Sequence, residues 1–148
     1  MVLNNEKLPL SSIRFRFRQL WYLKKKRHSE TALMRKSMSL VEGRLARWVD
    51  EGRYRIRYDS LEEIIEELGI TSDELRVYCS RKFHKSFLSW RKDLRMEDAK
   101  RMLLDFPDMP SGKIAGIIGI TDKSDFRHQF KSATGMTPTE WREKYSKK

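Results

Sequence analysis

The hydrophobic positions of this chain recur mostly at intervals of three and four residues. That spacing places side chains on one face of an α-helix. A clear example is the run Ile114, Ile117 and Ile118, which predicts an apolar helical face. Gly119 follows this run, at a point where a helix can end and the chain can turn tightly. The pattern therefore predicts a helix that ends in a glycine turn.

A second helix is expected directly after Gly119. Thr121 or Asp122 can cap its start, because a side-chain oxygen there accepts a backbone N–H of the first turn. Phe126 and Phe130 lie four residues apart and are expected to face inward. The positions turned outward carry polar and basic side chains: Lys123, Ser124, Arg127, His128 and Lys131. Together the two segments predict a helix-turn-helix over residues 111–133.

Capping signatures mark further helix starts. Thr137-Pro-Thr-Glu140 combines a cap, a proline at the first helical position and a returning glutamate. Ser60–Glu63 and Thr71–Glu74 have the spacing of capping boxes, and Gly69 stands between them. The residues expected inside this earlier pair of helices are Leu61, Ile64, Ile65, Leu68, Leu75, Tyr78, Cys79 and Phe83. Residues 60–84 therefore repeat the order helix, glycine turn, helix.

The segment between the two pairs predicts one long helix over residues 86–106, which Pro107 and Pro110 end. Its inward positions are Phe87, Trp90, Leu94, Ala99, Met102 and Leu103. A helix of this length spans roughly 30 Å. A further amphipathic helix, with Met34, Met38, Val41, Leu45 and Trp48 on one face, is expected before the first pair. Residues 53–59 alternate and are expected to be an extended connector.

The N-terminal part has a different character. Residues 1–12 show little periodicity and are expected to form a loose tail, and residues 28–37 read as a linker or a frayed helix. Residues 13–27 fit either a short strand or a helix and hold a lysine cluster after several aromatic residues. This order is typical of a segment beside a membrane-spanning helix. A solvated basic linker and a DNA-contacting arm are the alternatives.

Composition narrows the possible partners. The chain has 148 residues, 36% of them charged, and a formal net charge of +11, which indicates a polyanionic partner such as nucleic acid or an anionic membrane. The single cysteine, Cys79, excludes an internal disulfide, and the histidines His28, His84 and His128 are too far apart to suggest a metal site. We find no phosphate-binding loop or nucleophile motif, so neither enzymatic activity nor a cofactor is expected.

The segment 110–142 resembles the second helix-turn-helix of the AraC/XylS family of bacterial transcription regulators. The matching residues are Ile114-Ala115, Gly119, Asp122, Ser124, Phe126, Phe130-Lys131, Gly135, Thr137-Pro138 and Trp141-Arg142. Residues 60–84 resemble the first helix-turn-helix and residues 86–106 the linker helix of the family. Two positions depart from it: Ile65 replaces a small residue, and His84 replaces the glycine that ends the reading helix. We therefore expect a wider helix crossing at Ile65 and a different helix end at His84.

The resemblance implies an all-α fold, with two homeodomain-like three-helix units joined by the linker helix in residues 38–148, after a basic tail or linker in residues 1–37. It also implies sequence-specific binding of double-stranded DNA through two successive major grooves. The residues implied to contact bases are Asp73, Arg76, Val77, Lys123, Ser124, Arg127 and His128. Those implied to contact phosphates are Thr71, Ser80, Arg81, Ser111, Thr121 and Lys131.

The resemblance bears on partners and location as well. RNA polymerase and a second copy, joined through a region outside this chain, are further candidate partners. A cytoplasmic location is expected, either free or as the cytoplasmic end of a membrane-anchored regulator. The alternative function is a helical adaptor that binds a protein or an anionic membrane surface through residues 13–27.

Overall fold

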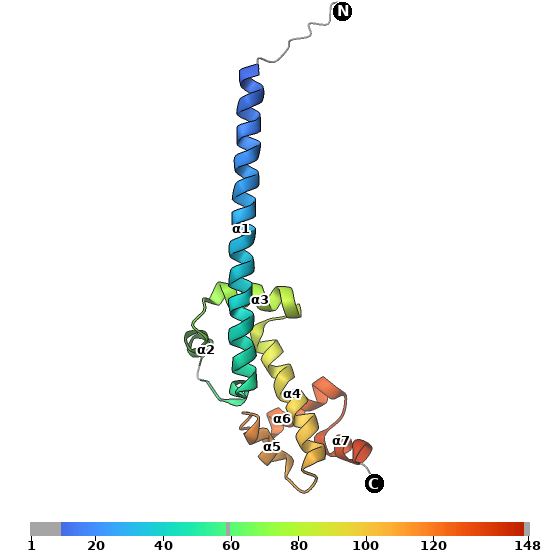
Figure 1. The fold of residues 1–148 in the computed structure, drawn as a ribbon. Helices are drawn as coiled ribbons and strands as arrows, with labels where there is room; N and C mark the ends of the chain where they lie inside the picture. The colour runs from blue at the N-terminus through green and yellow to red at the C-terminus, as the bar shows by residue number, and fades with distance from the viewer. Residues whose placement is uncertain (1–9, 59, 147–148) are drawn as a thin grey trace, which may run out of the picture. The chain divides into compact units, whose positions relative to one another are not determined.

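The computed structural model describes residues 10–58 and 60–146, and the side chains from residue 18 onward. Within these ranges every regular element is helical, which confirms the all-α prediction. The elements are α1 (Leu10–Asp50), the 3₁₀ turn η1 (Arg53–Arg55), α2 (Leu61–Leu68), α3 (Ser72–Phe83), α4 (Phe87–Asp105), α5 (Ser111–Ile117), α6 (Lys123–Thr134) and α7 (Pro138–Tyr145) (Figure 1).

The chain divides into two compact units, residues 1–39 and residues 40–148, and α1 contributes to both. In the N-terminal unit the open choice between strand and helix for residues 13–27 resolves to helix, as does the choice for residues 28–37. The expected loose tail is wrong for residues 10–12, which are helical, and its remaining residues lie outside the described part. None of the helices described is both long and apolar enough to cross a bilayer.

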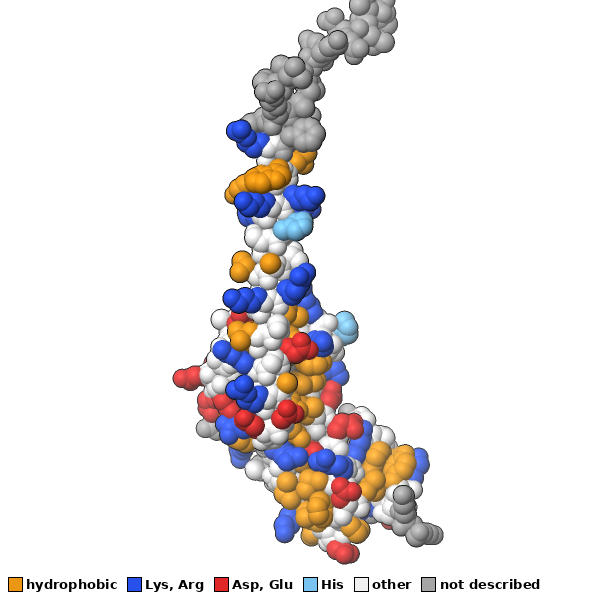
Figure 2. All heavy atoms as spheres, in the orientation of Figure 1, with side chains coloured by type: hydrophobic (Ala, Val, Ile, Leu, Met, Phe, Trp, Pro, Cys, Tyr) orange, Lys and Arg blue, Asp and Glu red, His pale blue; other side chains and the backbone are white. Residues whose placement is uncertain are grey.

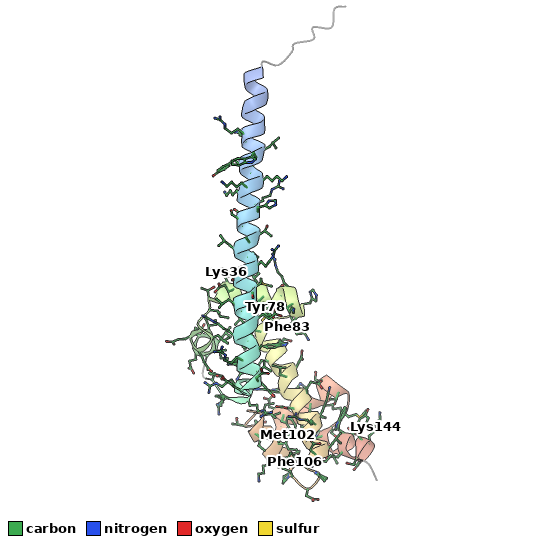
Figure 3. The ribbon with its side chains drawn as sticks, viewed as in Figure 1. Lys36, Tyr78, Phe83, Met102, Phe106 and Lys144 are labelled. Carbon is green, nitrogen blue, oxygen red and sulfur yellow. The ribbon has the colours of Figure 1, made fainter. Side chains whose placement is uncertain are left out.

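The C-terminal unit is organised around α4, which packs against α3, α5, α6 and α7. In Figure 1, α3 lies near the start of α4 and α6 lies towards its end. Met102 of α4, labelled in Figure 3, belongs to the apolar core that α4 shares with α5 and α6. The buried members of this core are Met96, Ala99, Met102, Leu103, Ile114, Ala115, Ile118, Ile120, Phe126 and Phe130. The linker helix is therefore part of the core that holds the second helix pair.

The first helix pair, α2 and α3, has a core of its own. Val41, Leu45 and Trp48 of α1 are buried, as the amphipathic pattern predicts, but Met34 on the same predicted face is 39% exposed. Trp48 lies beside Phe87, with ring centroids 5.6 Å apart, at the start of α4. On α3, Tyr78 and Phe83 pack edge to face at 5.7 Å (Figure 3). The first pair thus combines aromatic contacts with buried aliphatic side chains such as Ile64, Leu68 and Leu75.

Local signals in the sequence explain where the helices start. The hydroxyl of Ser60 accepts a hydrogen bond from the backbone N–H of Glu63. Thr71 with Glu74 and Thr137 with Glu140 form complete capping boxes, and Pro138 occupies the first turn of α7. Of the two candidate caps for α6, the structure selects Asp122, whose carboxylate accepts the N–H of Asp125 at 2.6 Å.

Three local expectations are wrong. His84 was expected to end α3 differently from glycine, yet it adopts the left-handed conformation, with φ of 55°, as a glycine would. Ile117 was expected inside, but 40% of it is exposed because α5 ends there. Residues 53–59 were expected to be extended, but residues 53–55 form a 3₁₀ turn held by hydrogen bonds to α4.

Candidate nucleic-acid interface

The second helix of each pair presents a polar surface to solvent. On α6 the side chains of Lys123, Ser124, Arg127, His128 and Lys131 are all exposed. Phe126 and Phe130, between them, are fully buried and fix the rotation of the helix about its axis. The inward aromatic pair therefore determines which side chains α6 can offer to a ligand.

The exposed cations of α6 form no close ion pair among the described residues, although Arg127 and Lys131 help to lower the pKa of the Glu140 carboxyl through their charge. Among the residues that the structure describes, Lys123, Arg127 and His128 form no ion pair or side-chain hydrogen bond. Lys123 and Ser124 lie in the first turn, where the partial positive charge of the helix N-terminus adds to the lysine charge. This arrangement suits an anionic ligand and leaves Arg127 available for a bidentate contact.

The corresponding surface of α3 is different. Asp73, Arg76, Ser80 and Arg81 are exposed, but Val77 is half-buried. Arg76 donates to the carboxylate of Asp73 at 3.0 Å, and both side chains are largely exposed. An exposed pair of this kind contributes little to stability, so it can open at small cost. It nevertheless places a negative charge beside the guanidinium that the resemblance implies for base contact.

Three of the residues expected to contact phosphates lie at helix starts, and they differ in exposure and in whether the side chain already caps the helix. Thr71 caps α3, and its hydroxyl accepts the N–H of Glu74 at 3.2 Å. Ser111 is the first residue of α5 and is half-buried, and Thr121 is exposed immediately before the cap Asp122. Thr71 is therefore already used as a cap, whereas the side chain of Thr121 is open to solvent.

Cys79 has no chemical role at this surface. It is fully buried on the inner side of α3, and burial raises the pKa of its thiol to about 11. A thiol with this pKa stays protonated near neutral pH and is a poor nucleophile. No cluster of potential metal ligands occurs among residues 10–58 and 60–146.

One buried polar network was missed at the sequence level. Arg91 and Arg95 of α4 donate to backbone carbonyls of the turn before α2, and Asp98 accepts from that turn. The signal was present, since Arg91, Arg95 and Asp98 alternate with apolar residues on the inner side of the predicted helix. Charged residues at intervals of three and four usually mark a solvent-facing helix surface, so this pattern did not indicate a buried network.

Two helix pairs with glycine turns, one at each end of a shared helix and each with an exposed second helix, define a double helix-turn-helix protein. A family model described as a helix-turn-helix domain matches residues 64–144, more than half of the chain. The chain belongs to the AraC/XylS family of transcription regulators. It is accordingly a DNA-binding domain of the transcription-regulator type.

Similarity to curated proteins agrees with this assignment. The chain is 40% identical over 57 residues to the arabinose operon regulatory proteins of Salmonella typhimurium and Escherichia coli. The match covers 38% of this chain and 20% and 19% of those proteins, so it spans about a fifth of their length.

Solved structures share the fold. The C-terminal domain of the response regulator AraT from Geobacillus stearothermophilus aligns over 78% of this chain and 87% of that one, with a TM-score of 0.59 and 22% identity. A Listeria innocua protein of unknown function aligns over 72% and 97%, with a TM-score of 0.61 and 25% identity. The C-terminal domain of the response regulator yesN from Fusobacterium nucleatum aligns over 66% and 94%, with a TM-score of 0.58 and 28% identity.

Proposed function

We propose that this chain is a sequence-specific DNA-binding output domain that reads two successive major grooves with α3 and α6. The observation that carries the proposal is the exposed basic surface of α6, which forms no close ion pair among the described residues and is fixed in rotation by Phe126 and Phe130. A helix in the major groove reads base edges with such side chains, and phosphate contacts hold it in register.

The two helices are assigned unequal roles. Arg127 is our main candidate for a bidentate contact with guanine, and Lys123, Ser124 and His128 are its neighbours on the reading surface. On α3, Arg76 is the main candidate, with Val77 placed to meet a thymine methyl group and Asp73 able to accept from cytosine. Because the Asp73 carboxylate pairs with Arg76, we expect α3 to contribute less discrimination than α6. The phosphate contacts are assigned to Thr71, Ser80, Arg81, Ser111, Thr121 and Lys131.

A selection from random duplexes tests this function. The full chain is incubated with a random library, bound duplexes are enriched, and the product is measured by gel shift against a scrambled duplex over a salt series. We expect a bipartite motif whose two parts are about one helical turn apart. Equal affinity for selected and scrambled duplexes at every salt concentration would mean that the chain binds only the DNA backbone.

A second candidate function rests on the N-terminal unit. Leu20, Trp21, Tyr22 and Leu23 are each more than half exposed, and Lys24–Arg27 follow them directly. Figure 2 shows hydrophobic and basic side chains following one another along this stretch of α1. Exposed aromatic residues beside a lysine cluster fit the boundary of an anionic membrane.

Sedimentation with vesicles distinguishes this second function. The full chain should sediment with phosphatidylserine vesicles and not with phosphatidylcholine vesicles if the segment binds anionic lipid. Replacing Lys24, Lys25 and Lys26 by Gln should abolish sedimentation, whereas Arg35→Gln with Lys36→Gln serves as the control. Retained sedimentation of the triple variant would exclude this role for the segment.

Other expectations from the resemblance stay predictions. They are contact with RNA polymerase, pairing through sequence outside this chain, and a cytoplasmic location. The compact unit of residues 40–148 is the part to which we assign DNA binding, with residues 60–84 and 111–133 as its two reading elements.

A further inference from the structure

The turn between α1 and α2 is held to α4 by a dense set of hydrogen bonds. The carbonyl of Tyr54 accepts from Arg91 Nε at 3.2 Å and from Arg95 Nε at 2.8 Å. The carbonyl of Ile56 accepts from the same two guanidinium groups, at 3.1 Å from Arg95 Nη2. Two arginines one helical turn apart thus donate to the carbonyls of two residues on either side of Arg55, which fixes the backbone of this turn on α4.

Asp98 secures the same turn through side chains. Only 6% of Asp98 is exposed, and its Oδ2 accepts from the Tyr54 hydroxyl at 2.5 Å and from Arg55 Nε at 2.6 Å. Its Oδ1 accepts from Arg101 at 2.8 Å. Burial acts to raise the pKa of this carboxyl, but the bonds from Arg55 and Tyr54 outweigh it and hold the pKa below its usual value. Asp98 therefore stays ionised, and each of its oxygens has a partner.

The turn also touches both helix pairs. On the first pair, Glu67 of α2 accepts from Arg53 Nε at 2.5 Å and from the Tyr58 hydroxyl. On the second pair, the glycine turn between α5 and α6 lies directly against it. A Cβ built on Gly119 would overlap the carbonyl oxygen of Arg55, so the two backbones are in contact there. Residues 53–58 thus connect α2, α4 and the turn that precedes α6.

A second connection between the helix pairs changes what α4 can do. Two helix pairs joined only through α4 could still rotate about the axis of α4 and bend at its ends. A second connection between the pairs that is also bonded to α4 removes these motions. One base pair of spacing moves a target by 3.4 Å along the duplex and by about a tenth of a turn around it. Fixing the helix pairs relative to each other therefore decides which spacing both can reach.

We propose that residues 53–58 form a brace that sets the spacing between the two DNA half-sites, with Asp98 and Gly119 as positioning residues. The inference rests on the proposed reading of two grooves. It assigns spacing selectivity to residues outside the set to which we assign DNA contacts, and it adds the brace to α4 as the element that holds α3 and α6 in register.

The test uses Asp98→Asn, which keeps the shape of the side chain and removes its charge. Duplexes carrying the selected motif are made with the natural spacing and with one base pair removed or added. For the wild type we expect roughly tenfold weaker binding at the altered spacings, the size of a modest duplex deformation cost. For Asp98→Asn we expect this penalty to fall to about twofold, with little change at the natural spacing.

The matched control is Glu97→Gln, the same kind of change one residue away on α4. Glu97 pairs with Lys100 at 2.5 Å at the surface and has no bond to the brace. Its spacing penalty should equal that of the wild type. Arg55→Gln gives a second reading, since it removes one bond to Asp98 from a side chain that is itself 36% exposed. Circular dichroism verifies that each variant is folded.

The outcomes separate the brace from the function on which it rests. A tenfold spacing penalty that survives in both Asp98→Asn and Arg55→Gln would overturn the brace. Relaxed spacing in Glu97→Gln as well would also overturn it, because any change of charge on α4 would then suffice. If the wild type binds a single half-site with no spacing preference, the reading of two grooves fails instead.

Discussion

The two helix-turn-helix pairs bury their inner surfaces with different side chains and different neighbouring helices. In the second pair, Phe126 and Phe130 are completely buried, and Trp141 of α7 packs edge to face on Phe130 at 5.8 Å. In the first pair, the inward line of α3 ends in Phe83, which is half-buried and stacks on Trp90 at 4.5 Å. The second pair thus closes its core with its own following helix, whereas the first depends on α1 and the brace.

The exposed surfaces of the two pairs also differ, in how available their basic side chains are to a ligand. The cations of α6 form no close ion pair among the described residues and act on the Glu140 carboxylate only at a distance, whereas Arg76 of α3 is directly paired with Asp73. The better-packed pair therefore also presents the more available basic surface. On the proposed reading of two grooves, we therefore expect the second pair to provide more of both the affinity and the discrimination, and the first pair to be easier to perturb.

The largest effect expected from this comparison is on stability. Phe130→Ala should reduce the free energy of unfolding by about 3–5 kcal/mol, because it leaves a cavity in a closed core. Phe83→Ala should cost about 1–2 kcal/mol, because part of that ring is already in water. Urea unfolding followed by circular dichroism measures both. Equal losses would contradict the difference in core closure.

The next largest effect on stability is expected from substitutions in the two glycine turns. Gly119→Ala should cost about 2–4 kcal/mol, since the left-handed backbone strains alanine and the new methyl group overlaps the brace. Gly69→Ala should cost about 1–2 kcal/mol, because its Cβ would meet only the movable end of Arg44. Thermal unfolding of the two variants compares these costs directly. A smaller loss for Gly119→Ala would mean that the turn and the brace are not in contact.

DNA binding should show the same order at the reading surfaces. Arg127→Ala should weaken binding to the selected duplex by about 1–3 kcal/mol, and Arg76→Ala by less than about 1 kcal/mol. Competition gel shifts at one salt concentration give both values. Lys144→Ala, which removes an exposed charge from α7, is the control and should have a small effect. A larger loss for Arg76→Ala would reverse the roles proposed for the two helices.

Helix ends provide a smaller and cleaner contrast. His84→Gly should stabilise the fold by about 0.5 kcal/mol, because relief of left-handed strain slightly exceeds the entropy that glycine loses. Gly135→Ala should destabilise by about 1 kcal/mol, since an added Cβ there meets no atom and only backbone strain is introduced. Matched urea curves test both signs. Destabilisation by His84→Gly would show that the imidazole itself holds the end of α3.

The smallest expected effect concerns the pH dependence of the second pair. The backbone N–H and hydroxyl of Thr137 lower the pKa of Glu140 below its ordinary value of 4.5. A carboxyl with a lowered pKa stabilises the folded state above its unfolded pKa, and this contribution is lost as the pH falls through the folded value. NMR titration of the Glu140 carboxyl should give a midpoint below 4.5, and Thr137→Ala should move it upward. An unshifted midpoint would contradict a formed capping box in solution.

Local rules in the sequence were enough to place most of the fold. Apolar spacing, capping boxes and glycine turns depend on neighbouring residues, and they located α2 to α7 to within a few residues. The sequence shows that Asp98 and Arg95 lie on the inner side of the predicted helix, but it does not identify their hydrogen-bond partners in the turn before α2, because these lie some forty residues away. The prediction that Ile117 faces inward was wrong for a related reason, since apolar spacing does not show where a short helix ends. The base and phosphate contacts assigned to α3 and α6 stay predictions.

The buried thiol of Cys79 makes distance measurements on this protein simpler. Because the chain has a single cysteine and burial raises the pKa of its thiol to about 11, maleimide reagents should leave the native protein unmodified. New cysteines at exposed positions such as Ser80 and Ser132 would then be labelled selectively without first removing the natural one. Fluorescent or spin probes at this pair would report the separation of α3 and α6 in solution.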